Sequence, residues 1–279
     1  CDAYLRFVFL TGVSRFGKLT IFSGLNSLND ISMDAQYAGI CGITKAELLE
    51  NFVPELELLA KAQALSYKDV LAELKKRYDG YQFTEEENVH VYNPFSLLNV
   101  LQKKKFRNYW YATGTPSFLV KYLYAEGVHF PDLEGEILLD QEGLETSPAD
   151  TEDPLPILFQ AGYLTIKEYL KDSGVYRLGF PNKEVYYGFL KNLLQGYAKH
   201  IKRPGTEIAK FLEEIRTGNV DAFMTRLKSI IGGIPYSNKK KEEYHEEHGE
   251  VAVYLVFSLM GRYIQTEVHT PGGRADAVV

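Results

Sequence analysis

The spacing of hydrophobic residues predicts a chain that is mostly helical, with a few short strands. In most segments apolar side chains recur every three or four residues, and a capping residue or a proline stands just before them. The first such segment opens at Thr44 with Glu47 three positions later, which is the spacing of a capping box. The predicted helices cover residues 44–51, 66–78, 95–102, 116–123, 183–199, 205–216, 220–231 and 244–260.

Three other parts of the chain have the composition or the alternation of strands. Residues 5–11, Leu-Arg-Phe-Val-Phe-Leu-Thr, are rich in β-branched and aromatic residues and predict a buried strand. Residues 163–166 and 175–180 flank a Lys-Asp-Ser-Gly turn and predict a β-hairpin. Residues 263–270 and 274–279 predict a second hairpin across a Pro-Gly-Gly turn.

The first hairpin follows a helix that ends at Gly162 and precedes the helix predicted over 183–199. Helix, hairpin and helix in this order suit a winged-helix module, although a packed hairpin with no binding role gives the same pattern. The preceding stretch, residues 142–156, is rich in acidic residues and prolines. It predicts a long loop and a domain boundary.

Composition and charge narrow the class of protein. Of the 279 residues 45% are hydrophobic and 24% charged, which excludes an intrinsically disordered chain. No apolar run approaches the roughly 18 residues that a membrane span needs. With 31 basic and 37 acidic residues the net charge is −6, which excludes a generally basic coat protein for nucleic acid. The two cysteines predict no disulfide framework and a reducing, cytoplasmic location.

A glycine-rich segment follows the first predicted strand. Residues 12–18, Gly-Val-Ser-Arg-Phe-Gly-Lys, have the spacing of a phosphate-binding loop. That chemistry needs a hydroxyl at the next position to hold Mg²⁺, but the residue there is Leu19, and no amphipathic helix follows. We therefore interpret the segment as a strand-end loop of an α/β sheet.

Two basic clusters are candidate contacts for nucleic acid. The first consists of Lys199, Lys202 and Arg203, which follow the helix after the winged-helix-like hairpin. The second, residues 103–107, alternates with aromatic residues up to Trp110. Such aromatic side chains either stack on bases or belong to the hydrophobic core.

Acidic residues near the carboxyl end suggest metal chemistry. Asp276 stands inside an apolar strand segment, Ala-Asp-Ala-Val-Val, and a buried carboxylate needs a partner or a metal ion. Upstream, residues 242–250 contain five glutamates and two histidines. The histidines, His245 and His248, have a spacing that allows zinc binding, whereas a solvated helix start gives the same composition because acidic residues are favoured there.

The two ends of the sequence predict that it is a fragment. It starts at Cys1 without an initiator methionine or a signal-like segment, and it stops at Val279 inside a strand-like run. A strand that ends inside a sheet leaves unpaired backbone groups.

Motifs along the whole chain resemble one family. Glu267-Val268-His269-Thr270 followed by Gly273-Arg274-Ala275-Asp276 is similar to the first half of a PD-(D/E)XK nuclease-like domain. Further motifs resemble the AAA-ATPase-like proteins, common in gut anaerobic bacteria, that carry such a domain at the carboxyl end. These motifs lie at residues 9–18, 21–26, 92–95, 109–116 and 162–166.

The resemblance implies ATP and Mg²⁺ as cofactors of a parent protein. It assigns metal binding to Asp276, assisted by a glutamate of the preceding helix, which is Glu246, Glu247 or Glu250. It places the family's own phosphate loop upstream of this chain, and it requires a further strand with Glu-x-Lys, a pattern found here only at residues 73–75 on a predicted helix. The resemblance therefore implies a fragment that is inactive by itself.

These expectations divide a mixed α/β, helix-rich chain into four parts. Residues 1–40 would be the tail of a P-loop-type ATPase core, 41–150 a helical region, 151–235 a winged-helix-like region and 236–279 the start of the nuclease-like domain. Two functions follow from them. One is part of an ATPase that cleaves nucleic acid with Mg²⁺. The other is a winged-helix module that binds nucleic acid or protein beside a vestigial nuclease tail.

Overall fold

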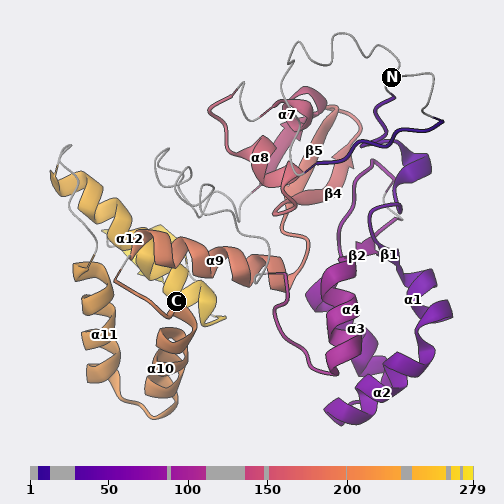
Figure 1. The fold of residues 1–279 in the computed structure, drawn as a ribbon. Coiled ribbons are helices and arrows are strands. Elements are labelled where there is room, and N and C mark those ends of the chain that lie inside the picture. Colours follow the sequence, from indigo (N-terminus) through magenta and orange to yellow (C-terminus); the bar gives the residue numbers. More distant parts are fainter. Residues whose placement is uncertain are drawn as a thin grey trace.

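The chain is mixed α/β and helix-rich, with small antiparallel sheets distributed among the helices (Figure 1). The computed structural model describes residues 6–12, 29–86, 89–110, 136–147, 151–198, 200–233, 241–261, 265–270 and 273–278; at 241–248, 265–270 and 273–278 it describes the backbone alone. Within these ranges, none of the helices has the length and apolar character that crossing a membrane requires.

The first part with its own core is the helical unit, residues 43–110. After a short 3-10 helix, η2 (Ala35–Tyr37), its elements are β1 (Ile43–Thr44), α1 (Lys45–Asn51), α2 (Val53–Gln63), α3 (Tyr67–Tyr78), β2 (Val91–Tyr92) and α4 (Pro94–Lys103). The capping box is confirmed, because Glu47 N donates to Thr44 Oγ1 at 3.2 Å and Thr44 N donates to Glu47 Oε2 at 2.8 Å. At the starts of α3 and α4 the side chains of Ser66 and Asn93 each accept a hydrogen bond from a backbone N–H of the first turn, which confirms both predicted helices.

Aromatic residues close the core of the helical unit. Phe106 stacks on Tyr78 with ring centroids 6.5 Å apart, and Tyr109 is buried. The Tyr78 hydroxyl donates to Arg107 O at 2.7 Å and accepts from Arg107 N at 3.1 Å. The aromatic residues of the cluster at 103–107 therefore belong to the core, which is the second of the two alternatives.

A three-stranded antiparallel sheet with two short helices forms the sheet unit, residues 136–182. Its elements are β3 (Ile137–Asp140), α7 (Gln141–Glu145), α8 (Leu155–Gln160), β4 (Thr165–Leu170) and β5 (Val175–Gly179), in the strand order β3–β5–β4. The hairpin expected here is confirmed. The long loop expected over 142–156 is wrong at both ends, where α7 and α8 form. β3 comes before residue 150 in the chain and pairs with β5, which comes after it. A domain boundary at residue 150 would therefore divide a single sheet.

Four helices follow, and all four agree with the predicted segments. They are α9 (Lys183–Tyr197), α10 (Pro204–Arg216), α11 (Val220–Gly232) and α12 (Lys241–Leu259). The predicted apolar stripe of α9 is buried, and α9 packs along α12 (Figure 1). Val251 and Leu255 of α12 belong to one core cluster with α9 and the sheet unit. In the part of the chain that is described, residues before and after the boundary expected at residue 235 therefore share one hydrophobic core.

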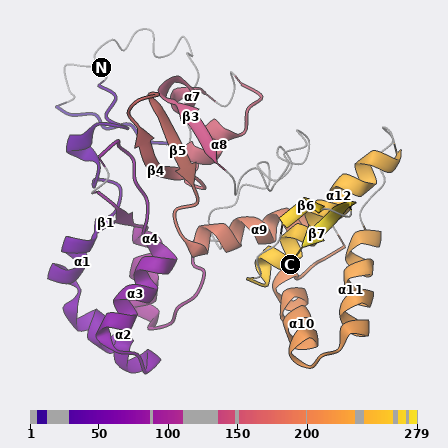
Figure 2. The same cartoon turned by 180° about the vertical axis from the view of Figure 1, so that it is seen from behind.

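The last two strands, β6 (Gln265–Thr270) and β7 (Gly273–Val278), pair as an antiparallel hairpin. This confirms the second predicted hairpin. The hairpin contacts α12 and lies beside it and α9 (Figure 2).

The strand expected over residues 5–11 is wrong where the structure describes it, because residues 6–12 have no regular structure. Phe7 is 81% exposed, and Val8, Phe9 and Leu10 are exposed as well. Their composition favours a strand, but a strand is stable only when a neighbour satisfies its backbone groups, and none of the described strands pairs with this segment. The helix expected over 116–123 and residues 13–18 of the glycine-rich segment lie outside the described residues.

One loop joins the helical unit to the sheet unit. Gln82 N donates to Thr165 Oγ1 at 2.8 Å, and the same hydroxyl donates to Gln82 O at 2.9 Å. Three residues further on, Glu85 Oε1 accepts from the Tyr176 hydroxyl at 2.6 Å. These buried and half-buried bonds hold the loop against β4 and β5, so the two units share a fixed contact.

Candidate metal site and basic groove

Asp276 lies in the middle of β7, opposite an acidic residue of β6. The ladder pairs on either side of it are Thr266 with Ala277 and Val268 with Ala275. They bracket Glu267 and Asp276, which therefore stand at opposite positions of the two strands. Residues directly opposite share one face of a sheet, and two like charges there repel each other. A divalent cation would remove this repulsion, so the hairpin is a candidate cation site.

Glu267 is a candidate ligand that the sequence reasoning missed. The signal was present in the predicted hairpin, because Glu267 and Asp276 each stand three residues from the pair Thr270–Gly273 that closes the turn. Equal distance from the turn places two residues opposite each other in an antiparallel pair.

The helix next to the hairpin, α12, carries a third acidic residue, Glu250. Glu250 Oε1 is enclosed by protein and has no hydrogen-bond partner among the residues that the structure describes. Glu250 stands on α12, which contacts both β6 and β7. An enclosed carboxylate oxygen requires a donor or a cation, so Glu250 is the best-described helix glutamate of the predicted set. Glu247 lies one turn earlier on α12, and its side chain is outside the described part.

The residues of this region fit Mg²⁺ by their chemistry. Carboxylate oxygens are the hard ligands that this ion takes from proteins. The side chains that the structure describes include no group of three or more His, Cys, Asp or Glu placed to hold a metal ion. The side chains of Asp276, Glu267 and Glu247 lie outside the described part of the structure.

The predicted nucleic-acid cluster lies at a second site. Lys202 and Arg203 line a groove of about 750 Å³ between the α9–α10 connection and α11, which we call the basic groove. Lys199 lies outside the described residues. The opposite wall is one face of α11, with Ala222, Thr225, Arg226, Ser229 and Ile230. The structure therefore brings two of the three predicted basic residues to one concave surface.

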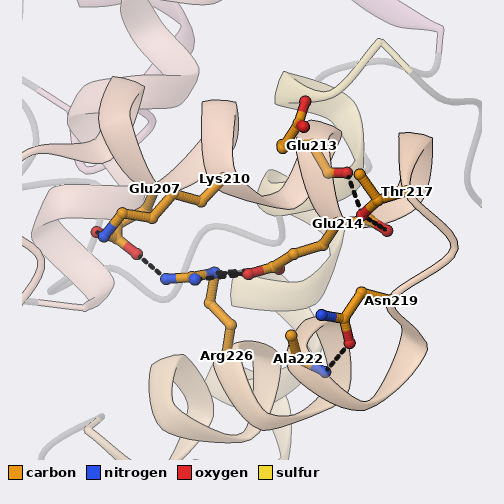
Figure 3. A network of polar contacts seen from close by, with 8 residues as sticks. All are labelled: Glu207, Lys210, Glu213, Glu214, Thr217, Asn219, Ala222 and Arg226. Carbon is orange, nitrogen blue, oxygen red and sulfur yellow. Dashed lines mark hydrogen bonds and ion pairs between the residues drawn. The ribbon is translucent and has the colours of Figure 1, made fainter.

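An ion-pair network joins α10 and α11 beside the basic groove (Figure 3). The Arg226 guanidinium lies between two carboxylates, with Nη1 2.7 Å from Glu207 Oε2 and Nη2 2.5 Å from Glu214 Oε1. Lys210 Nζ lies 3.0 Å from the other oxygen of Glu207. The bonds run from α10 to α11 and join the two helices.

The network shifts the protonation equilibria of Arg226 and Glu207. Hydrogen bonding to Glu214 raises the pKa of the Arg226 guanidinium. Although burial opposes ionisation of Glu207, hydrogen bonds from Lys210 and Arg226 hold the pKa of its carboxyl below the ordinary value. The network pairs two basic side chains with two acidic ones, so its formal charges balance. The sequence held no motif for this arrangement.

In the sheet unit the pair α7–α8 lies between β3 and the β4–β5 hairpin. Gln160 of α8 donates to Leu144 O at 3.1 Å and Thr146 O at 2.8 Å, which fixes the pair. Residues 136–182 contain nine acidic and three basic residues. One of the basic residues, Arg177, is paired with Glu136 and Glu168. The surface of the unit is therefore acidic, unlike that of a nucleic-acid reader.

Comparison with known proteins finds a relative that is similar along the whole chain. No protein-family model matches the chain, and no solved structure matches it. Over 285 aligned positions the chain is 34% identical to a protein of Azotobacter chroococcum mcd 1 described as an uncharacterized protein in the vnfD 5′ region. The alignment covers 100% of this chain and 52% of the relative. The chain thus spans about half the length of the curated relative that it matches.

Proposed function

We propose that this chain is part of a longer AAA-ATPase-like protein that binds ATP and cleaves nucleic acid with Mg²⁺. In this proposal residues 236–279 begin its PD-(D/E)XK nuclease-like domain. The observation that carries the proposal is the position of Asp276, opposite Glu267 on a hairpin that contacts α12. The ATP-binding part is supported by the resemblance of residues 9–18 and 21–26 alone.

The proposal gives the acidic residues definite tasks. Asp276 and Glu250 supply carboxylate oxygens to the ion, and Glu267 adds negative charge at the same ladder position. When bound, Mg²⁺ polarises a phosphoryl oxygen and activates a water molecule. The chemistry also needs a Glu-x-Lys strand. The pattern at Glu73–Lys75 does not serve, because it lies on α3 and Glu73 pairs there with Arg77 at 2.8 Å. We therefore expect this chain to bind the ion without cleaving nucleic acid.

Replacing Asp276 with asparagine is expected to weaken metal binding by the 279-residue chain at least about ten-fold, because one anionic ligand is lost. Mn²⁺ serves as the probe, and binding is measured by the water-proton relaxation it causes. Glu57→Gln, an exposed residue on α2 with the same loss of charge, is the matched control and should bind like the wild type. Equal Mn²⁺ binding by Asp276→Asn and Glu57→Gln would contradict the metal role of Asp276.

Cleavage is tested on the full-length protein that carries this segment. Asp276→Asn is expected to reduce Mg²⁺-dependent cleavage of DNA or RNA at least about 100-fold, because loss of a residue that only supports a metal ligand already costs up to that much. Cleavage that continues at the wild-type rate would remove Asp276 from the proposed active site.

The second candidate function is a winged-helix module that binds another protein. The order β3–α7–α8–β4–β5 supports it, and the acidic surface favours a basic protein segment over nucleic acid. Lys171 is exposed at the tip of the β4–β5 hairpin, and the structure describes no ion pair for it. If the hairpin acted as a wing on nucleic acid, Lys171 would be the basic residue that contacts it. It therefore provides a direct test between the two partners.

Lys171→Ala is expected to leave the affinity for duplex DNA within about two-fold of wild type, measured by fluorescence anisotropy at low salt. Lys68→Ala, an exposed lysine of α3, is the matched control. A wild-type chain that binds no duplex supports the same conclusion. A loss of ten-fold or more in Lys171→Ala alone would instead assign the hairpin to nucleic acid.

A further inference from the structure

The positive charge of the basic groove that is free to act on a ligand stands on two residues. Two carboxylates of α10, Glu207 and Glu214, are neutralised by Lys210 and Arg226. Neither Lys202 nor Arg203 forms an ion pair with any of the described residues, and both side chains are exposed. The charges left to act on a ligand are therefore those of Lys202 and Arg203, opposed only by Asp221 in the lining.

Neutral donors lie on one wall of the basic groove, and the positive end of a helix lies on the other. Thr225 and Ser229 are exposed and four residues apart, so their hydroxyl groups lie on the same face of α11. On the other wall α10 begins at Pro204, and no side chain caps its first turn. The positive end of this 13-residue helix therefore adds to the field of Arg203, which stands at the N-cap position.

The shape of the groove favours an extended ligand. Its α11 wall runs from Ala222 to Ile230, which is about 12 Å at 1.5 Å per residue. A single inorganic phosphate would fill only a small part of about 750 Å³. An extended polyanion can place one phosphate at the basic end and further groups along the hydroxyl groups of the helix.

We infer that the basic groove binds the phosphate backbone of a nucleic acid, with Lys202 and Arg203 as the contacts to phosphate. Thr225 and Ser229 donate hydrogen bonds from α11. Arg226 has a positioning role, because its ion pairs hold α10 and α11 at the separation that keeps the groove open. This inference rests on the proposed function in one respect, since it names the substrate class of that nuclease-like protein.

The test uses the 279-residue chain and a fluorescein-labelled single-stranded oligonucleotide, in EDTA so that no metal contributes. The double variant Lys202→Ala/Arg203→Ala is expected to bind at least about ten-fold more weakly than wild type at 50 mM salt. The slope of log K against log salt should fall in magnitude by roughly 1.4, since each lost phosphate contact removes about 0.7 on a single strand. Lys61→Ala/Lys68→Ala removes the same charge from the exposed surface of α2 and α3 and should leave affinity and slope unchanged.

Three outcomes would overturn the inference: no binding by the wild type, equal loss in both double variants, or complete competition by 1 mM inorganic phosphate, which would show a site for a small anion. Far-UV circular dichroism checks that each variant is folded.

Asp276→Asn separates this inference from the proposed function. If the groove binds nucleic acid, this variant keeps its oligonucleotide affinity in EDTA even where its Mn²⁺ binding is lost. If Asp276 has no metal role, the effect of the groove variants is still the same.

Discussion

Glu184→Ala is expected to lower the free energy of unfolding by about 2–4 kcal/mol, because it leaves one buried and one half-buried backbone donor without an acceptor. Glu184 stands in the first turn of α9 and is 2% exposed. Its Oε1 accepts from Tyr109 N, and from Trp110 N at 2.9 Å. One carboxylate therefore ties the end of the helical unit to the start of α9. Urea unfolding followed by circular dichroism measures the effect.

Glu184→Gln separates the hydrogen bonds from the charge. The amide oxygen can accept from the same two N–H groups, so the loss should stay within about 1 kcal/mol. Glu142→Ala is the matched control, since Glu142 is an exposed acidic residue in the first turn of α7, and its loss should also stay below about 1 kcal/mol. If Glu184→Ala cost no more than Glu142→Ala, the bridge to Tyr109 and Trp110 would have no structural role.

The pH dependence of the free energy of unfolding provides a second test of the role of Glu184. Burial raises the pKa of Glu184 above its ordinary value of 4.5. The folded protein therefore holds this proton more tightly than the unfolded chain does, so the free energy of unfolding falls as pH rises from 4.5 through the raised pKa. Glu184→Gln does not titrate and should lose this contribution to the slope. A slope identical to that of the wild type would show that Glu184 is not the group responsible.

Elements with strong local signals were predictable from the sequence. Thr44 with Glu47 specifies the start of α1, and Asn93 before Pro94 specifies the start of α4, because the capping groups lie within one turn of the backbone they satisfy. The β4–β5 hairpin follows from alternation on both sides of one turn. In each case the residues that stabilise the element are close to it in sequence.

Elements that depend on distant partners were not predictable. The four residues of β3 show no pattern that predicts a strand. They form one because they pair with β5, where Ile137 lies opposite Leu178, far along the chain. Residues 5–11 show the converse, because their composition is that of a strand but residues 6–12 have no paired neighbour. Strand formation depends on such pairing more than on composition.

The same distinction applies to the candidate sites. Asp276 was identified because its position in an apolar strand is a local feature, and Lys202 and Arg203 because they are adjacent. The network around Arg226 joins residues of two antiparallel helices, and no spacing within either helix indicates it. Glu184 was missed for another reason: an acidic residue in the first helical turn usually faces solvent, where the helix dipole favours it.

Gly80→Ala is expected to lower the free energy of unfolding by about 3 kcal/mol, more than alanine costs at other glycines with positive φ. Gly80 has φ +104°, which alone costs an alanine about 1–2 kcal/mol. A Cβ atom at this position would also lie 2.3 Å from Pro181 O, a backbone atom that can move only with the start of α9. The contact occurs where the helical unit meets the sheet unit, so relieving it requires the two units to separate.

Gly174→Ala isolates the backbone contribution, since Gly174 has φ +70° and no atom within 4 Å of the added Cβ. Its expected cost is therefore only about 1 kcal/mol. Both variants are measured by urea unfolding under the same conditions, and the difference between them reports the contact with Pro181. Equal costs would mean that the loop at Gly80 moves freely away from Pro181. In that case the hydrogen bonds of Gln82 with Thr165, two residues later, would also not hold the units together.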